Sequence, residues 1–574
     1  MTAPQQRRRN VSTVSLLIWL APLAFLALFY FYPLGSILST GFGRAEGSAA
    51  APLLEAWSSP LTRRALWFTT WQAALSTLLT LMVGLPGAYL FARFEFPGKR
   101  LLQALAGIPF VMPTLVVAAA FNALLGPRGW VNMGLMSLFD LAAPPIQFSQ
   151  TLGAILLAHV FYNTTIVLRM VGDFWAHLDP RLTAAARTLG ASPLAAARRI
   201  TLPLLLPAIL AAALLVFIFD FSSFGVILIL GGPSFVTLEV EIFYQTTSLF
   251  NLPLAAALSV IQLLCNLALT VAYTRLSNRI SRPLSLQSRR RSQRPLRGWK
   301  QRLASGVVLV IIFSLLLTPL AALALRSVMR LEPERGSTSV DAGFTLDFYR
   351  ALNENPRESA FYGPPLEAVG ISLGYAAITV VLSLFLGFPA AWALARHEET
   401  FLSRAFDPII MLPMGTSAVT LGLGFIVALS GPPLYLSTSP LLIPLAHTLV
   451  AFPFTVRSLT PALRSIQPRL RQAAATLGAR PGQVVRYIDL PLIGRAAIVA
   501  ATFAFTISIG EFGATAVIAR PEYATIPIAI YRFLGQPGAM NYGQALALST
   551  ILMVVCGGGL LFIERLRLGE IGEF

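Results

Sequence analysis

Long apolar runs constrain the fold of this 574-residue chain more than any other feature of its sequence. Residues 204–231, for example, contain one charged residue, Asp220. A run of about 20 apolar residues can cross a bilayer as an α-helix, whereas a membrane β-strand needs only about ten residues of alternating character. Because backbone polar groups find no water inside a bilayer, a lipid-embedded run of this length must be helical. The sequence therefore predicts an all-α integral membrane protein.

Composition supports a chain built mainly of membrane helices. Hydrophobic residues make up 56% of the sequence and charged residues 12%, about half the charge of a typical soluble domain. We expect about 12 transmembrane helices, with ends uncertain by several residues. They lie near 14–36, 66–92, 102–125, 150–169, 204–231, 252–274, 304–325, 366–395, 405–429, 438–456, 492–518 and 543–563.

The charged residues between these runs predict the orientation. The net charge of +18 does not indicate nucleic-acid binding, because the basic residues lie between apolar runs rather than on a soluble domain. Alternate loops, including 181–199 and 464–486, are rich in arginine, whereas the loop at 232–251 carries Glu239 and Glu241 and no basic residue. Basic loops stay in the cytoplasm. We therefore expect a multi-pass protein of the bacterial inner membrane with both termini in the cytoplasm.

One polar segment occurs twice, each time just before a long apolar run. Residues 184–203 read AAARTLGASPLAAARRITLP, and residues 472–491 read QAAATLGARPGQVVRYIDLP. Gly190 and Gly478 are 288 residues apart, and the Ile-x-Leu-Pro ends of the two segments share this spacing. We call these segments the first and second repeat loops. By charge, both are expected on the cytoplasmic side.

The duplication extends over most of the chain. His159 and His447 match at the spacing of 288, whereas Arg93 and Arg396 match at a spacing of 303. Because six helices restore the starting orientation, the halves are expected to be parallel six-helix repeats related by a pseudo-two-fold axis along the membrane normal. The predicted organisation is a first membrane unit at 1–280, a basic cytoplasmic linker at 281–302 and a second membrane unit at 303–574.

Glycine and proline predict the shape of the repeat loops. Gly190 allows a tight bend after an alanine-rich helical turn. Pro193, three residues later, suits the first turn of the next helix. Pro203 is expected to end that short helix where the membrane run begins. The second loop has the same three residue types at the same positions, so we expect the same shape twice.

These loops resemble the cytoplasmic "EAA" loops of permease subunits of binding-protein-dependent ABC importers. In that family the loop forms a helix that docks into a groove of an ATPase subunit. The family's leading Glu is replaced here by Ala184 and Gln472. The docking residues that the resemblance implies are Ala185, Ala186, Gly190, Ile200, Leu202, Pro203, Ala473, Ala474, Gly478, Ile488, Leu490 and Pro491.

The resemblance covers essentially the whole chain, as a fused permease with two six-helix units. It implies as partners two copies of an ABC ATPase subunit, which bind the ATP and Mg²⁺, and an external solute-binding protein. Within the family, the segments 154–163, 230–242 and 511–531 are similar to those of thiamine and ferric-iron permeases. The implied solute is therefore a small one such as a thiamine-like cation or ferric iron.

The chain lacks the residues for hydrolysing ATP itself. A phosphate-binding loop ends in Lys followed by Ser or Thr, but Lys99 and Lys300 are followed by Arg and Gln. Cys265 and Cys556 lie inside apolar runs and indicate buried small residues rather than a disulfide or a metal site. We therefore expect no enzyme activity, metal or cofactor in this chain. The main alternative is a gradient-driven secondary transporter with twelve helices, and a second is a membrane scaffold.

Polar residues inside the predicted membrane helices are candidates for the translocation pathway. Charge at membrane depth is costly and marks a pathway or a partnered site. Asp220 corresponds to Ser508, and Ser223 corresponds to Glu511, in the register of 288. The alternative is hydrogen bonding between packed helices, which we also favour for the paired histidines His159 and His447.

Overall fold

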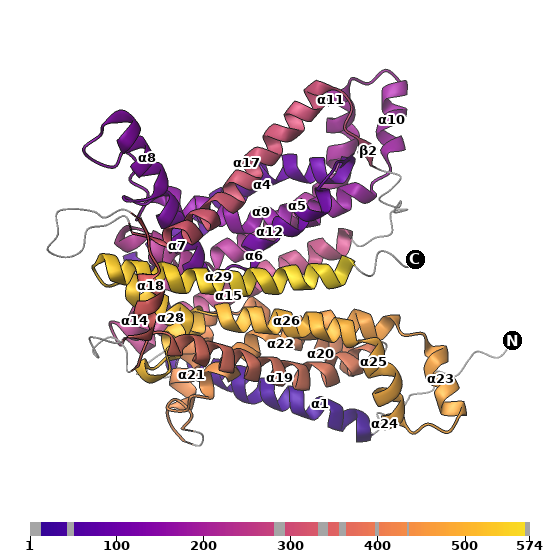
Figure 1. The fold of residues 1–574 in the computed structure, drawn as a ribbon. Coiled ribbons are helices and arrows are strands. Elements are labelled where there is room, and N and C mark those ends of the chain that lie inside the picture. Colours follow the sequence, from indigo (N-terminus) through magenta and orange to yellow (C-terminus); the bar gives the residue numbers. More distant parts are fainter. Residues whose placement is uncertain are drawn as a thin grey trace.

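The computed structural model describes residues 13–42, 51–280, 293–330, 343–354, 363–396, 401–432 and 435–568 (Figure 1). Apart from turns and four two-residue strands, the described chain is helical. Strand β1 (Phe94–Glu95) pairs in parallel with β2 (Arg294–Pro295), and β3 (Met329–Arg330) pairs antiparallel with β4 (Gly343–Phe344). Most of the predicted linker, residues 281–292, lies outside the described residues, and so does most of the polar segment near 326–364.

The helices of the first half precede the linker. They are α1 (Thr13–Leu26), η1 (Ala27–Phe31), α2 (Tyr32–Phe42), α3 (Ala51–Ser58), α4 (Pro60–Arg93), α5 (Lys99–Leu105), α6 (Ile108–Val111), α7 (Thr114–Leu125), α8 (Trp130–Phe139), α9 (Leu152–His177), α10 (Pro180–Thr188), α11 (Pro193–Ala196), η2 (Ala197–Thr201), α12 (Leu202–Phe221), α13 (Gly225–Leu230), η3 (Gly232–Ser234), α14 (Leu238–Thr247) and α15 (Leu252–Ile280).

The helices of the second half follow the linker. They are α17 (Trp299–Arg326), α18 (Asp347–Arg350), η4 (Ala351–Asn353), α19 (Glu367–Arg396), α20 (Phe401–Met411), η5 (Leu412–Gly415), α21 (Ala418–Leu429), α22 (Leu442–Ser465), α23 (Pro468–Thr476), α24 (Pro481–Val484), η6 (Val485–Asp489), α25 (Leu490–Leu492), α26 (Gly494–Gly510), α27 (Gly513–Ile518), η7 (Pro521–Tyr523), α28 (Ile526–Leu534) and α29 (Ala539–Leu568).

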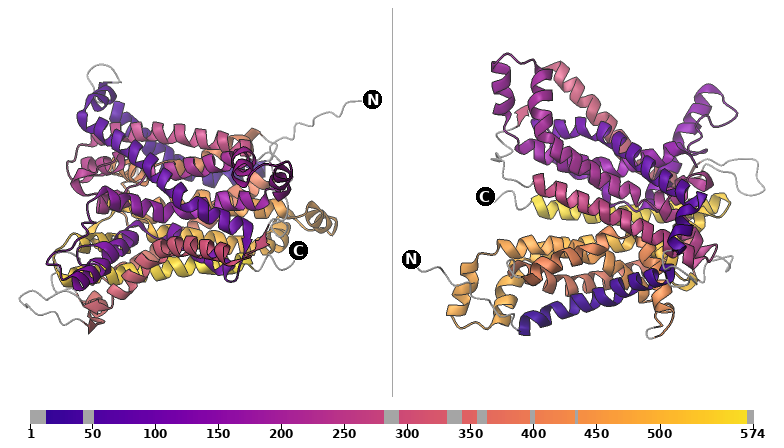
Figure 2. Two further views of the ribbon diagram at one scale, coloured as in Figure 1. Left: turned by 90° about the horizontal axis from the view of Figure 1, so that it is seen from above. Right: turned by 180° about the vertical axis from the view of Figure 1, so that it is seen from behind.

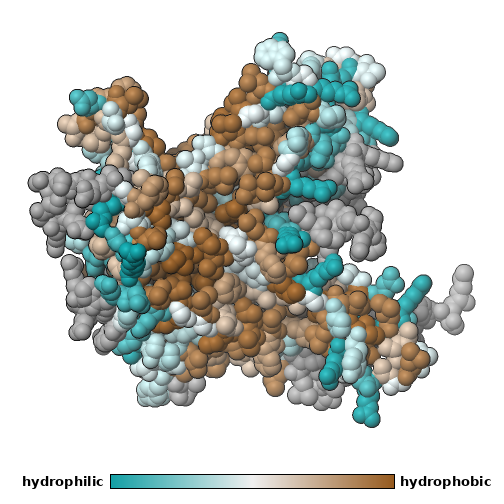
Figure 3. Space-filling model, viewed as in Figure 1, coloured by the Kyte–Doolittle hydropathy of each residue, from teal (hydrophilic) through white to brown (hydrophobic). Residues whose placement is uncertain are grey.

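The described helices confirm the expected all-helical membrane protein. Ten of them are long and apolar enough to cross a membrane, or up to twelve if two bent pairs count as one span each. On the face shown in Figure 3, hydrophobic residues form a broad central region, and hydrophilic residues gather toward two opposite edges. The two repeat loops lie at opposite corners of one of these edges (Figures 1 and 2), which we call the loop edge.

Two of the predicted spans were placed wrongly at their far ends. The expected helix 204–231 ends at Phe221, and the expected helix 492–518 ends at Gly510. In each half a short helix, α13 or α27, follows after a break at Phe224 or Phe512. The apolar run continues through the break, so hydropathy alone could not locate it.

The expectation of a loop at 232–251 was also wrong. This segment folds into α14, which packs against α15 and against α21 of the second half. Glu239 and Glu241, expected in a solvated loop, are 1% and 7% exposed. The segment returns into the protein because Thr237, Val240 and Ile242 are buried against neighbouring helices.

The two halves exchange their first helices. Helices α1 and α2 pack against α19 and α21 of the second half, whereas α17 packs against α7 and α4 of the first half. Tyr30 of the first half hydrogen-bonds Thr416 of the second through their hydroxyl oxygens, 2.7 Å apart. The first helices of each half therefore pack on the other half, and the two units of sequence are interleaved in space.

Glycine permits equivalent close contacts in both halves. A Cβ built on Gly84 of α4 would lie 2.7 Å from Val167 of α9, and one on Gly387 of α19 would lie 2.6 Å from Thr455 of α22. These residues correspond in the two registers, 303 for the glycines and 288 for their neighbours. Close backbone approach at small residues is a principal source of helix association in membranes.

Gly387→Leu should therefore destabilise the protein, because the side chain would overlap Thr455, and overpacking of this kind costs about 1–3 kcal/mol. The measurement is the thermal unfolding midpoint in detergent. Gly374→Leu is the matched control, since a Cβ at this position of the same helix meets no atom within 4 Å. Equal midpoints for the two variants would contradict the packing account.

Candidate functional site

The two repeat loops have the same backbone structure. Helix α10 ends at Gly190 with φ +89°, and helix α23 ends at Gly478 with φ +83°. The Ala191 amide donates to the Ala186 carbonyl at 3.0 Å, and the Ala479 amide donates to the Ala474 carbonyl at 3.0 Å. This bond is part of the Schellman arrangement, in which a left-handed residue closes a helix. The predicted bend at each glycine is confirmed.

The expectation that Pro203 ends the short helix was wrong. Residues Pro193–Phe221 form one continuous helical segment, with a π-helical turn, η2, just before the proline. The Leu202 amide donates to the Ala197 carbonyl within this wider turn. Proline is tolerated there because a π-turn rearranges the hydrogen bonds around its missing N–H group. In the second half the helix does break, by 71° between Leu492 and Gly494.

The twelve predicted docking residues have matching exposure in the two loops. The first alanine of each pair, the glycine, the leucine and the proline are exposed, whereas the second alanine and the isoleucine are half-buried. The exposed positions are Ala185, Gly190, Leu202 and Pro203, and Ala473, Gly478, Leu490 and Pro491; the half-buried ones are Ala186, Ile200, Ala474 and Ile488.

Two further leucines in each half, one within the repeat loop and one just before it, were missed by the sequence analysis. Leu189 and Leu477, beside the glycines, are 88% and 89% exposed. Leu182 and Leu470, one helix length earlier, are 49% and 47% exposed. Both pairs are spaced by 288 residues. Leucine at matching positions of two polar helices was the signal that could have identified them.

Four aromatic rings meet where the two halves face each other. Phe224 stacks on Phe512 with ring centroids 5.5 Å apart, and these two residues correspond in the repeat. Phe243 lies 5.2 Å from Phe224, and Tyr531 lies 5.5 Å from Phe512, again as a corresponding pair. Residues that correspond by symmetry and also touch must lie at the symmetry axis. This aromatic quartet therefore marks the pseudo-two-fold axis.

Two buried carboxyl groups of α14 lie beside the quartet in sequence. Glu239 accepts a hydrogen bond from Gln262 at 3.3 Å, and Glu241 accepts one from Gln245 at 2.6 Å. Within the described residues, neither forms an ion pair. Helix α14 lies outside the candidate spans, and burial raises the pKa of Glu239 to about 8, so this carboxyl is mostly protonated at pH 7.

The pathway candidates of the first half form a hydrogen-bonded cluster. Asp220, 1% exposed, accepts a bond from the Asn163 amide at 2.7 Å and lies 3.5 Å from Nδ1 of His159. The same ring contacts Ser76 at 3.0 Å through Nδ1 and Ser223 at 2.8 Å through Nε2. These contacts join α4, α9, α12 and the break that follows α12.

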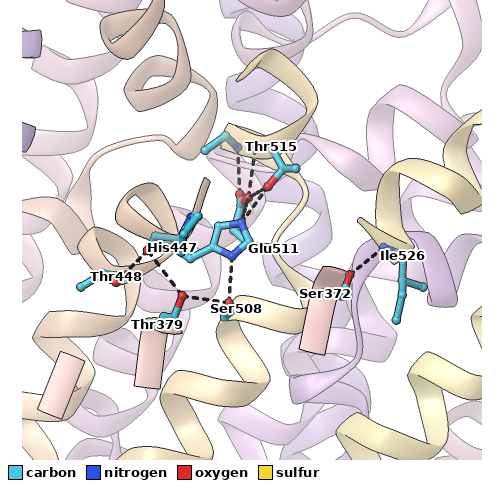
Figure 4. Close-up of polar contacts among 10 residues, drawn as sticks. Ser372, Thr379, His447, Thr448, Ser508, Glu511, Thr515 and Ile526 are labelled. Carbon is cyan, nitrogen blue, oxygen red and sulfur yellow. Dashed lines mark hydrogen bonds and ion pairs between the residues drawn. The ribbon is translucent and has the colours of Figure 1, made fainter. Parts of the chain in front are cut away.

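The second half builds an equivalent cluster around His447 (Figure 4). Its Nδ1 lies 2.8 Å from Ser508 Oγ, and its Nε2 lies 2.8 Å from Thr515 Oγ1 and 3.4 Å from Glu511. Glu511 also accepts the backbone amides of Ala514 at 2.8 Å and Thr515 at 3.0 Å. This carboxylate therefore caps the start of α27 and contacts the histidine.

Acid and serine have exchanged places between the two clusters. In the first half the acid precedes the break, at Asp220, and the serine follows at Ser223; in the second half Ser508 precedes and Glu511 follows. The hydrogen-bond partners of each acid come from its own half. The predicted interhelical hydrogen bonding of both histidines is confirmed.

No metal centre is visible in the described part of the chain. It contains no group of three or more His, Cys, Asp or Glu placed to hold an ion. Cys265 and Cys556 are both free thiols; Cys556 is buried, as expected, whereas Cys265 is half-buried.

Known proteins and one family profile match most of this sequence. The sequence profile described as "Binding-protein-dependent transport system inner membrane component" matches residues 82–282 and 383–563. The thiamine transport system permease protein ThiP of Salmonella typhimurium is 27% identical over 528 residues, which cover 89% of this chain and 91% of the relative. ThiP of Escherichia coli is 26% identical over 570 residues, covering 97% of this chain and 96% of the relative.

Among solved structures, a bacterial ABC transporter involved in the import of the acidic polysaccharide alginate is similar, with a TM-score of 0.40 and 18% identity. The match covers 47% of this chain and 96% of the other.

The exchange of acid and serine generates a prediction. Asp220→Ser should lower the thermal midpoint, because Asn163 and His159 lose a buried carboxylate partner, at a cost of about 1–3 kcal/mol. Adding Ser223→Glu rebuilds the arrangement of the second half, in which backbone amides after the break donate to the carboxylate, and should restore much of the loss. A double variant no more stable than Asp220→Ser would show that the two clusters are not interchangeable.

Proposed function

The chain belongs to the family of binding-protein-dependent transport system inner membrane components, and we propose that it carries a small cationic solute inward between its two halves. As the membrane permease of a binding-protein-dependent ABC importer, it is not itself an enzyme, and ATP is bound by a separate ATPase subunit. This assignment sets aside the gradient-driven transporter and the scaffold.

We propose that the two repeat loops dock two copies of the ATPase subunit. The observation that carries this proposal is that both loops have the same backbone hydrogen bonds at the glycine and expose the same side chains, including Leu189 and Leu477. A single exposed leucine is common on protein surfaces, but here two exposed leucines recur at matching positions of both repeats, which favours a partner surface shared by the two loops. Because Ala184 and Gln472 replace the family's leading Glu, docking here rests on apolar contacts rather than on that charge.

The docking proposal also sets the orientation. ATPase subunits hydrolyse cytoplasmic ATP, so the loop edge faces the cytoplasm. Helix α1 begins and α29 ends at this edge (Figure 1), which agrees with cytoplasmic termini. The aromatic quartet lies beyond the far ends of α12 and α26, toward the external side. In this state the stacked rings of Phe224 and Phe512 close the external end of the proposed path between the two halves.

We propose that the solute passes along the axis once ATP-driven movement of the loops separates these rings. The solute would meet aromatic faces on both halves and the Glu241 carboxylate on the first. Aromatic faces and a carboxylate both attract cations. The thiamine transport relatives support a thiamine-like cation as the solute. An external binding protein would deliver it.

Replacing Leu189 and Leu477 by serine should abolish stable ATPase docking. Burial of a leucine contributes about 1.5–3 kcal/mol, so the double variant should weaken binding at each loop by a factor of about 10 to 150. Binding is measured between the purified permease and its ATPase subunit. Leu138→Ser is the control, because Leu138 is 75% exposed on α8, away from the loops. Unchanged docking by the double variant would refute the proposed site.

Glu241→Gln should reduce thiamine uptake about ten-fold, because it removes the buried carboxyl group that the solute is proposed to meet. Uptake is measured in cells that lack their own thiamine importer and express this permease with its ATPase and binding protein. Glu522→Gln is the control, since Glu522 is an exposed acid of the second half. No thiamine uptake by the wild-type system, with uptake of a ferric complex instead, would overturn the proposed solute and leave docking untouched.

A further inference from the structure

The two docking loops are joined to their membrane helices in different ways. The first loop continues into α12 as one helical segment, Pro193–Phe221. The second is separated from α26 by the 71° bend between Leu492 and Gly494. Gly494 corresponds to Leu206 of the first half, and glycine weakens a helix at this point. A displacement of the second loop is therefore not carried along a straight helix.

A buried carboxylate just before the break connects the second loop to a neighbouring membrane helix. Asp489, fully buried, accepts Nε of Arg471 at 2.7 Å and Nη2 of Arg396 at 2.9 Å. It also accepts Nε1 of Trp392 at 3.3 Å, and the Arg396 guanidinium lies 4.3 Å from the centre of the Trp392 ring. Arg471 belongs to the loop helix α23, whereas Arg396 and Trp392 belong to the membrane helix α19. We call this set the Asp489 brace.

The first half has no equivalent brace among its described residues. Thr201 and Thr183 occupy the positions of Asp489 and Arg471, and their hydroxyl oxygens are 3.3 Å apart. Arg93, the counterpart of Arg396, donates to the Leu178 carbonyl at 3.3 Å and interacts electrostatically with Asp179 at the start of α10, so no buried carboxylate of the loop itself holds it. Hydrogen bonds between charged partners are about twice as strong as those between neutral ones. The duplication has thus kept the loop and changed its attachment.

We propose that Asp489 is a positioning residue that makes the second docking loop move as one body with α19, so that the two docking sites transmit ATPase motion by different routes. The first loop transmits ATPase motion along its own continuous helix into α12, and the second transmits it through the brace to α19. The proposal rests on the proposed docking of ATPase subunits and adds that the two sites are mechanically unequal.

The brace is more than a fold-stabilising ion pair because of where it acts. The bend interrupts the helical connection from the loop to α26, and the brace connects the same loop to a different membrane helix, α19. An ion pair needed only to shape the loop would have no reason to reach α19, since the first loop has the same shape with two threonines. Transmission and local stability therefore make different predictions for α19.

Hydrogen exchange of the full permease, docked to its ATPase in nanodiscs, tests the proposal. The readout is the change in amide exchange on ATP binding, measured separately for α12 and α19. In Asp489→Asn, the change at α19 should fall at least five-fold while the change at α12 and the affinity for the ATPase stay within two-fold of wild type. Thr201→Ala is the matched control and should leave both changes intact.

A second variant does not depend on Asp489. Leu206→Gly places the glycine of the second half into the unbraced first half, at a side chain that is 46% exposed. It should reduce the change at α12 at least five-fold and spare α19. In contrast, Gly494→Ala, where the added Cβ meets no atom within 4 Å, should leave the α19 response of the wild type unchanged, because Gly494 connects the loop to α26 rather than to α19.

The proposal is overturned if Asp489→Asn leaves the α19 response intact, or if it reduces α12 and α19 equally. If Asp489→Asn does not fold, an unchanged α12 response in Leu206→Gly overturns it instead. Failure of the wild-type permease to bind an ATPase would be a different result, since it would refute the proposed docking function itself.

Discussion

Contact between Phe224 and Phe512 determines how the two repeated halves meet. Corresponding residues of a duplicated chain can touch only at the symmetry axis, so this stacked pair marks one end of the axis between the two halves. The exchanged helices α1, α2 and α17 then hold each half against the other. The repeat loops lie at the opposite end, at the corners of the loop edge, where a small rotation about the stacked pair would produce the largest displacement.

Duplication preserved the backbone frame and changed the polar chemistry placed on it. The left-handed glycines, the close helix contacts at Gly84 and Gly387 and the breaks before α13 and α27 all recur. The histidine clusters recur with acid and serine exchanged. Glu241 has Ala529 as its counterpart, and Asp489 has Thr201. The two halves of this permease therefore differ in the buried acid of α14 and in the attachment of the repeat loop.

Sequence reasoning predicted what depends on local chemistry and hydropathy. Helix length, the bend at Gly190 and the pairing of His159 with neighbouring helices all followed from residue type and spacing. It did not predict the ends at Phe221 and Gly510, because the apolar run continues across both breaks. Nor did it predict the buried position of Glu239, since its partner Gln262 is brought near only by the folding back of α14. The Asp489 brace was missed for the same reason: Arg396 lies 93 residues away in sequence.

If the loops dock ATPase subunits as proposed, ATP-driven closure of those subunits should bring the two repeat loops closer together. Arg181 and Arg469, corresponding exposed residues on α10 and α23, provide matched positions for spin labels once Cys265 and Cys556 are replaced by serine. The distance between labels at Arg181→Cys and Arg469→Cys, measured by pulsed electron paramagnetic resonance in the ATPase complex, should shorten when ATP binds. A distance unchanged by ATP in a complex that hydrolyses it would contradict the account.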